Sequence, residues 1–257
     1  MRIIHMSDLH LTKDGHSIWG TDTMEHFNKS IEIIRGMKDV DAIIVTGDIS
    51  NDGSIWTYQY ADIMFASIGI PTFCCPGNHD SLKVMLDDYV PSLYKVLPPA
   101  CVICGWKIMM LNSVISDDND LNLNKSRGFL SNDSMSYIKQ ELDEGIPTII
   151  ALHHPAQEPG GWLNRKLLDN RNEFNNMISF YDNARLVIYG HTHYFTDVQQ
   201  GHTRYSSSTS VGFAFDKDLP KFQIADGLEG FSVIEIDNSI INIRNINLKS
   251  ICSRGIP

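Results

Sequence analysis

Five apolar runs in this chain of 257 residues are each followed directly by a short polar cluster. Each run has the length of a buried strand. The runs are 3–6, 42–45, 71–75, 149–152 and 186–189. Apolar residues at helical spacing, such as Phe27, Ile31 and Ile34, lie between them. Strands that alternate with helices form βαβ units with a largely parallel sheet, so we expect an α/β fold.

The five polar clusters are rich in Asp, Asn and His. They are Asp8 with His10, Asp48, Asn78 with His79 and Asp80, His153 with His154, and His191 with His193. In an open α/β sheet, ligands bind at the carboxyl edge of the strands, where these clusters would gather. Buried polar groups need partners, and a metal centre would supply them.

Seven of these residues suffice for two metal sites of four protein ligands each, if Asp48 is shared by both ions. They are Asp8, His10, Asp48, Asn78, His153, His191 and His193. A mixed set of nitrogen and oxygen ligands without thiolate suits Mn, Fe, Zn or Co better than Mg or Ca. We therefore expect two divalent or mixed-valence ions as the cofactor.

Two ions about 3.5–4 Å apart form a clamp for in-line displacement at phosphorus, with a bridging hydroxide as the nucleophile. His79 follows the predicted ligand Asn78 but is not itself expected to bind metal. We predict that His79 is catalytic, either donating a hydrogen bond to a phosphoryl oxygen or protonating the leaving alkoxide.

The ordered set of clusters resembles the calcineurin-like metallophosphoesterases, from Met1 to about Ser210. Within that superfamily the chain is most similar to bacterial class III cyclic nucleotide phosphodiesterases, for example in the segment 160–163 after His153 and His154. The resemblance implies a four-layer α/β/β/α sandwich of two mixed sheets flanked by helices. It also implies two ligand sets that share Asp48: Asp8, His10, Asp48 and His193 for one ion, and Asp48, Asn78, His153 and His191 for the other.

The chain departs from many relatives at one position. They carry Asp three residues after the shared Asp, often paired with the catalytic His, whereas this chain has Asn51 followed by Asp52. Whether Asp52 replaces that partner of His79 is left open. Asp52, Asp80 and His154 are candidates for contacts around the ligands or with the substrate.

The resemblance implies a phosphodiesterase for a small phosphodiester, with 3′,5′-cyclic AMP as first choice and AMP as product. A glycerophosphodiesterase, or a broad-specificity phosphodiesterase or phosphatase, would share the same ligands. Segments 160–171 and 215–226 are expected to form the rim that distinguishes these substrates. From another class, a non-catalytic metal-binding scaffold for protein interactions is the alternative, although such scaffolds typically lack some of these residues.

Net charge is −10, which argues against stable binding of nucleic acid. No apolar stretch approaches the roughly 18 residues of a membrane span, and the first predicted strand begins at Arg2, so we expect a cytoplasmic protein. We expect one domain, 1–257, with a catalytic core in 1–200. The β-rich part 201–257 is predicted to complete the second sheet and the site rim, and its free edge strand offers a surface for a homodimer.

Overall fold

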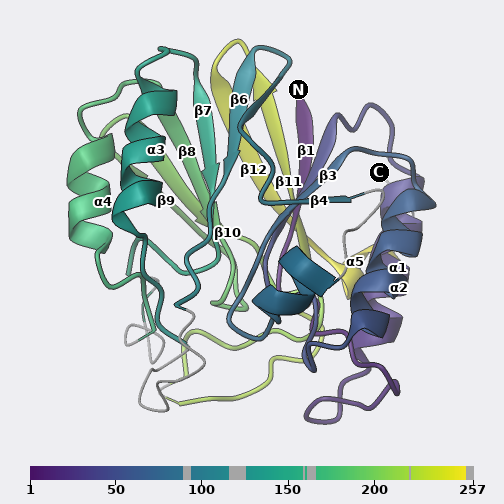
Figure 1. Cartoon of the computed structure of the whole chain (residues 1–257). Coiled ribbons are helices and arrows are strands. Elements are labelled where there is room, and N and C mark those ends of the chain that lie inside the picture. The colour runs from purple at the N-terminus through teal and green to yellow at the C-terminus, as the bar shows by residue number, and fades with distance from the viewer. Residues whose placement is uncertain (89–93, 116–125, 159, 161–165, 220, 253–257) are drawn as a thin grey trace.

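The computed structural model describes residues 1–88, 94–115, 126–158, 160, 166–219 and 221–252 (Figure 1). The segment 116–125, which the sequence predicts to be a surface loop, lies outside the described residues. Each of the five predicted runs forms a strand, and the predicted helical segments form helices. Asp22 and Ser131 cap two of these helices, because their side-chain oxygens accept from the backbone N–H groups of Glu25 and Ser134.

The strands are β1 (Arg2–Met6), β2 (Ala42–Thr46), β3 (Thr72–Cys75), β4 (Tyr94–Val96), β5 (Cys101–Ile103), β6 (Trp106–Met110), β7 (Thr148–Ala151), β8 (Ala184–Tyr189), β9 (Thr196–Gln200), β10 (Thr203–Ser207), β11 (Gly230–Asp237) and β12 (Ile240–Asn247). The helices are α1 (Thr23–Arg35), α2 (Ile55–Ala66), the π-helical turn η1 (Val84–Asp88), α3 (Asn132–Leu142), α4 (Arg171–Ile178) and α5 (Leu248–Cys252).

The described strands form two mixed six-stranded sheets. The first has the order β12-β11-β1-β2-β3-β4, in which β1 to β4 are parallel and β11 and β12 are antiparallel to their neighbours. The second has the order β5-β6-β7-β8-β10-β9, in which β6, β7, β8 and β10 are parallel. Antiparallel strands therefore lie at one edge of the first sheet and at both edges of the second, whereas β4 is a parallel edge strand.

Alternate side chains of the central strands face opposite layers. Ile4 and Ile43 pack towards α1 and α2, whereas Ile3 and Ile44 pack against the second sheet. The second sheet packs its other face against α3 and α4, with Phe174 in that layer. Figure 1 shows the two sheets face to face, with α1 and α2 outside one and α3 and α4 outside the other. The predicted α/β/β/α sandwich is confirmed.

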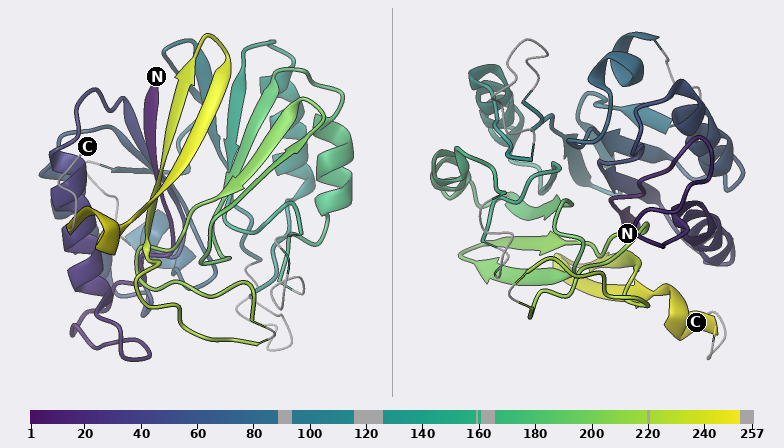
Figure 2. Two further views of the ribbon diagram at one scale, coloured as in Figure 1. Left: turned by 180° about the vertical axis from the view of Figure 1, so that it is seen from behind. Right: turned by 90° about the horizontal axis from the view of Figure 1, so that it is seen from below.

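The place of the last two strands differs from the prediction. The hairpin of β11 and β12 extends the first sheet beside β1 (Figure 2). Among the described strands of the part 201–257, β10 joins the second sheet, between β8 and β9. Phe231 and Val233 of β11 are fully buried, as in an inner strand, whereas side chains of β12 alternate between exposed and partly buried, as at an edge. Periodicity identifies a strand but not its partner, and for this reason the sequence did not reveal that β11 and β12 join the first sheet.

None of the helices in the described parts of the chain combines the length and apolar character that crossing a membrane requires.

Candidate metal centre

The candidate ligands follow the carboxyl ends of strands from both sheets. Asp8 and His10 follow β1, Asp48 follows β2, and Asn78 follows β3. From the second sheet, His153 follows β7, and the pair His191 and His193 follows β8. The face-to-face packing brings these ends together at one edge of the sandwich, which is the edge seen from below in Figure 2.

Asp48 lies at the centre of the cluster and is almost fully buried. Its Oδ1 accepts from the backbone N–H of His79 at 2.8 Å. Its Oδ2 lies 3.6 Å from Nε2 of His10 and 3.5 Å from Nε2 of His153. One carboxylate oxygen thus faces a histidine from each sheet, which is the arrangement that a shared ligand requires.

The remaining candidate ligands divide into two groups around Asp48. On one side, Nε2 of His193 lies 3.3 Å from Nε2 of His10 and 3.4 Å from Oδ1 of Asp8. On the other side, Nε2 of His153 lies 3.1 Å from Oδ1 of Asn78 and 3.2 Å from Nδ1 of His191. These groups contain the same residues as the two ligand sets that the family resemblance implies, and Asp8 also lies near Asp48 and His153.

The spacing of these atoms fits a metal ion. Two ligand atoms bound to one tetrahedral ion at about 2.1 Å stand about 3.4 Å apart, close to the separations within each group. Nδ1 of His191 and Nε2 of His153 face each other at 3.2 Å, as do the Nε2 atoms of His10 and His193 at 3.3 Å. Buried imidazole nitrogens whose lone pairs face one another destabilise the folded state, and a bound cation would remove this destabilisation.

The second nitrogen of three imidazoles is oriented by an oxygen. Nδ1 of His153 lies 2.7 Å from the carbonyl oxygen of Thr46, and Nδ1 of His193 lies 2.8 Å from that of Phe213. Nδ1 of His10 lies 3.1 Å from Oδ1 of Asn51. Since an oxygen of this kind accepts the Nδ1 proton, each ring is left with a lone pair on Nε2, as in a metal ligand.

Burial sets the charge states of the cluster. It lowers the pKa of His10, His153 and His191, so these rings are neutral, which is the form that binds metals. Burial also raises the pKa of Asp48 to about 8. The nearby His79 opposes this rise, and the negative charge of Asp8 adds to it. A divalent cation would reverse that shift, because it favours the ionised carboxylate.

The backbone adopts unusual conformations at these residues. Asp8, His10, Asp48, His191 and His193 all have positive φ, between 47° and 68°. Positive φ is uncommon for residues other than glycine, and clusters of such residues are typical of functional sites. The turn after β8 is also tight, since a Cβ on Gly190 would lie 1.9 Å from Oγ of Ser7 and 2.9 Å from Oδ2 of Asp8.

His79 and Asp80 have different surroundings. His79 is exposed, and its ring lies edge-on to that of His10 with centroids 4.8 Å apart. Asp80 is buried and accepts from the backbone N–H groups of Ser50 and Gly77, both at 2.9 Å. Asp80 therefore joins the loops after β2 and β3.

Within the described residues, Asp52 forms no hydrogen bond with His79, although both line a second cavity of about 310 Å³. Oxygens of Asp52 accept from the backbone N–H groups of Lys13 at 2.8 Å and Ser54 at 2.9 Å, and these bonds hold the loop before α2. His154 is fully buried behind His191, and its Nδ1 lies 2.9 Å from Oγ of Ser113. Asp52 and His154 thus support the loops, and neither lines the larger cavity that opens over the ligand cluster.

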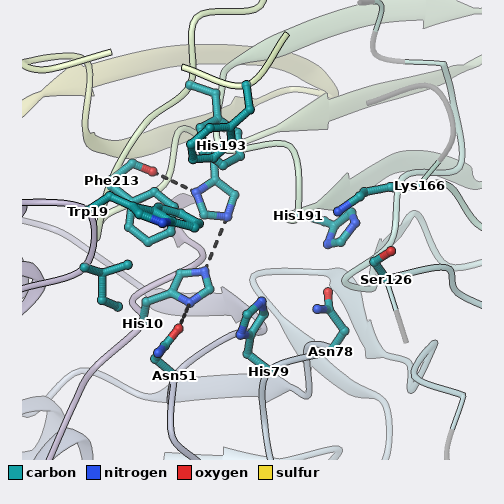
Figure 3. Close-up of a pocket in the computed structure, with 13 residues that line it drawn as sticks. His10, Trp19, Asn51, Asn78, His79, Ser126, Lys166, His191, His193 and Phe213 are labelled. Carbon is teal, nitrogen blue, oxygen red and sulfur yellow. Dashed lines mark hydrogen bonds between the residues drawn. The ribbon is translucent and has the colours of Figure 1, made fainter. Parts of the chain in front are cut away.

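A cavity of about 750 Å³ opens over the cluster. Figure 3 shows Trp19 and Phe213 on one side of His10 and His193, with Lys166 and Ser126 on the other. Phe215 and Phe222 also line the cavity, and they come from the predicted rim segment 215–226. Lys166 comes from the other predicted rim segment, 160–171. Sequence reasoning anticipated both rim segments but missed Trp19 and Phe213, because isolated aromatic residues are more often core residues.

The sandwich and its Asp/His cluster define the class of metal-binding phosphoester hydrolases. Residues 1–195 match the model of the calcineurin-like phosphoesterases, and the chain belongs to this family. Family membership confirms the predicted hydrolase, and calcineurin-like phosphoesterases use divalent metals.

Relatives and solved structures agree with this assignment. A 3′,5′-cyclic-nucleotide phosphodiesterase of Nostoc sp. is 29% identical over 240 residues, which cover 91% of this chain and 87% of that protein. A 3′,5′-cyclic adenosine monophosphate phosphodiesterase of Escherichia coli is 25% identical over 249 residues, with coverage of 92% and 85%. A dimetal phosphatase from Danio rerio shares the fold, with a TM-score of 0.70 over 95% of both chains at 11% identity.

Proposed function

We propose that the protein is a cytoplasmic phosphodiesterase that uses two metal ions and hydrolyses 3′,5′-cyclic AMP to AMP. The observation that carries the proposal is the position of Asp48, whose Oδ2 faces His10 on one side and His153 on the other. Asp8, His10 and His193 would hold one ion with Asp48, and Asn78, His153 and His191 would hold the other. The names of the Nostoc and Escherichia coli relatives support the choice of substrate.

When bound, such a pair of ions, drawn from Mn, Fe, Zn and Co, supplies charge stabilisation and lowers the pKa of a water molecule. The chain's own residues position the diester. His79 is exposed at the cavity, where it can donate a proton to the leaving ribose oxygen. Lys166 places a positive charge on the opposite wall, where it would attract a phosphoryl oxygen.

A complete ligand set supports an enzyme over a non-catalytic scaffold. All seven candidate ligands converge, and His79 lies beside them. A scaffold would have no need for an exposed histidine at the mouth of the cavity. Metal analysis combined with an activity assay separates the two, since an inert protein with both metals bound would favour the scaffold.

The test is a substrate panel with the protein loaded separately with Mn, Zn, Fe or Co. The panel contains cyclic AMP, cyclic GMP, a 2′,3′-cyclic nucleotide and a glycerophosphodiester. We expect cyclic AMP to have the highest kcat/KM, and Asp48→Ala to abolish metal-dependent turnover. Turnover of another diester without cyclic AMP would refute the substrate, and full activity of Asp48→Ala would refute the two-metal mechanism.

A further inference from the structure

Trp19 is a large apolar side chain that the fold leaves 60% exposed at the mouth of the cavity. Its indole contacts Phe213, with ring centroids 4.9 Å apart and planes at 80°, and Phe222, at 4.7 Å and 68°. Burial does not explain this position, because a packed core residue would lose most of its exposed surface.

The backbone at Trp19 is also unfavourable for such a residue. Ile18 and Thr21 exchange two backbone hydrogen bonds of 2.9 Å, which close a two-residue turn. Trp19 and Gly20 occupy its centre with φ of 47° and 84°. Turns with two positive φ values favour Asn, Asp or Gly, and a bulky residue there is strained. An exposed tryptophan in a strained turn indicates a role other than stability.

Aromatic rings continue from Trp19 down to the metal centre. Phe213 lies 4.8 Å from the ring of His10 and 4.5 Å from that of His193, and Phe215 stacks on His193 at 4.4 Å. We call Trp19, Phe213, Phe215 and Phe222 the aromatic wall. A substrate whose phosphate is held at the metal centre would place its organic group against this wall.

The opposite side of the cavity is polar. Lys166 lies there beside Ser126, and within the described residues it forms no ion pair (Figure 3). The cavity thus separates an anion-binding side from an aromatic side. A planar aromatic group fits the aromatic side, because stacking on an aromatic ring stabilises any nucleobase.

We propose that Trp19 stacks on the base of the nucleotide and, with Phe222, makes the site specific for nucleoside phosphodiesters over aliphatic ones. This inference rests on the proposed phosphodiesterase function. It assigns the recognition of the base to the turn 18–21 and to the rim segment 215–226, away from the metal ligands.

Equilibrium binding to the metal-loaded full chain tests the proposal independently of turnover. AMP is compared with ribose 5-phosphate, which has the same sugar and phosphate but no base. We expect wild type to bind AMP about 5- to 150-fold more tightly, the range that stacking on one aromatic residue gives. Trp19→Ala and Trp19→Leu should lose this preference, Trp19→Phe should keep part of it, and affinity for ribose 5-phosphate should not change.

Two further variants separate recognition from folding. Trp56→Ala is the matched control, because Trp56 is another exposed tryptophan that stacks on Tyr60 of α2, outside the cavity lining. It should leave the preference for AMP unchanged. Trp19→Asn suits the positive φ, so we expect its melting temperature to stay within about 4 °C of wild type while the preference is lost.

The possible results are distinct. Equal affinity of wild type for AMP and ribose 5-phosphate, or a preference that survives Trp19→Ala, overturns the proposal. A preference for phosphocholine over AMP that disappears in Trp19→Ala also overturns it, because the wall would then bind a quaternary ammonium group. A Trp19-dependent preference for AMP without turnover of any diester supports the aromatic wall and refutes the phosphodiesterase function. Turnover of cyclic AMP without a preference for the base supports the phosphodiesterase function and refutes the aromatic wall.

Discussion

Asn51 shows how one side chain outside the ligand set can adjust a metal site. Its Oδ1 lies 3.1 Å from Nδ1 of His10 and orients that ring. We expect Asn51→Ala to weaken binding of the ion beside His10 by about 10- to 100-fold, the usual effect of removing such a partner. Asn51→Asp should bind at least as tightly as wild type, because a carboxylate is the stronger acceptor. Competition with a chelating dye measures both, and equal affinities in all three proteins would contradict this role.

His79 can be tested through the leaving group. Its side chain is exposed, and only its backbone N–H holds Asp48, so His79→Gln should retain both metals. We expect kcat for cyclic AMP to fall by about 10²- to 10⁴-fold, the usual contribution of a general acid. A bis(p-nitrophenyl) diester should lose far less, because its leaving phenolate needs no proton. Equal losses on both substrates would exclude the role of acid, and loss of metal would make His79 a ligand.

At the scale of elements, the site depends on the close contact between the turn after β8, at Gly190, and the loop after β1, at Ser7 and Asp8. A Cβ on Gly190 would lie 1.9 Å from Oγ of Ser7 and 2.7 Å from the carbonyl oxygen of Thr46. We expect Gly190→Ala to destabilise the protein by more than about 3 kcal/mol, or to abolish metal binding, because buried backbone cannot move freely.

Gly145→Ala is the control, since its φ is +75° but its surroundings are open. It should cost only about 1–2 kcal/mol in urea unfolding. Similar values for the two variants would contradict the argument.

The elements also show what could be predicted from the sequence. The strands before Asp8, Asp48 and His153 were recognisable because each apolar run and its polar cluster are adjacent in the chain. The place of β11 was not, because its pairing with β1 joins residues more than 220 positions apart. The contact of Trp19 with Phe213 also joins residues far apart, at positions 19 and 213 of the chain, so no local pattern could reveal the aromatic wall.

For the whole molecule, the candidate ligands connect the two sheets. Asp8, His10, Asp48 and Asn78 come from the first sheet, and His153, His191 and His193 come from the second. Metal present at 100 times its Kd would stabilise the folded state by about 2.7 kcal/mol per site. Since a change of 1 kcal/mol shifts Tm by about 2–4 °C at this size, we expect chelation to lower Tm by about 5–20 °C. A Tm that chelation leaves unchanged would contradict binding that spans both sheets.

The metal-free protein should be most stable near pH 6.5, because two groups of residues have opposite effects. Burial lowers the pKa of His10, His153 and His191 from 6.5, so the unfolded chain binds protons first and stability is lost as the pH falls below 6.5. Burial raises the pKa of Asp48 from 3.8 to about 8, so the folded chain holds that proton and stability is lost as the pH rises towards 8.

Below pH 6.5 the three histidines, together with His5, outweigh Asp48 and Asp80, whose pKa values are raised by burial. Between pH 6.5 and 8 these histidines no longer change charge, and Asp48 lowers stability by at most about 1.4 kcal/mol per pH unit. Asp48→Asn removes this loss of stability between pH 6.5 and 8, because an asparagine side chain does not titrate. The Oδ1 of the asparagine can still accept from the backbone N–H of His79, and its amide can donate to Nε2 of His10 or His153. Without metal, Asp48→Asn should therefore be more stable than wild type at pH 8, and with metal the order should reverse. Urea unfolding in EDTA from pH 5.5 to 8.5 measures the profile. A wild-type stability that keeps rising from pH 6.5 to 8 would show that Asp48 is already ionised without a cation.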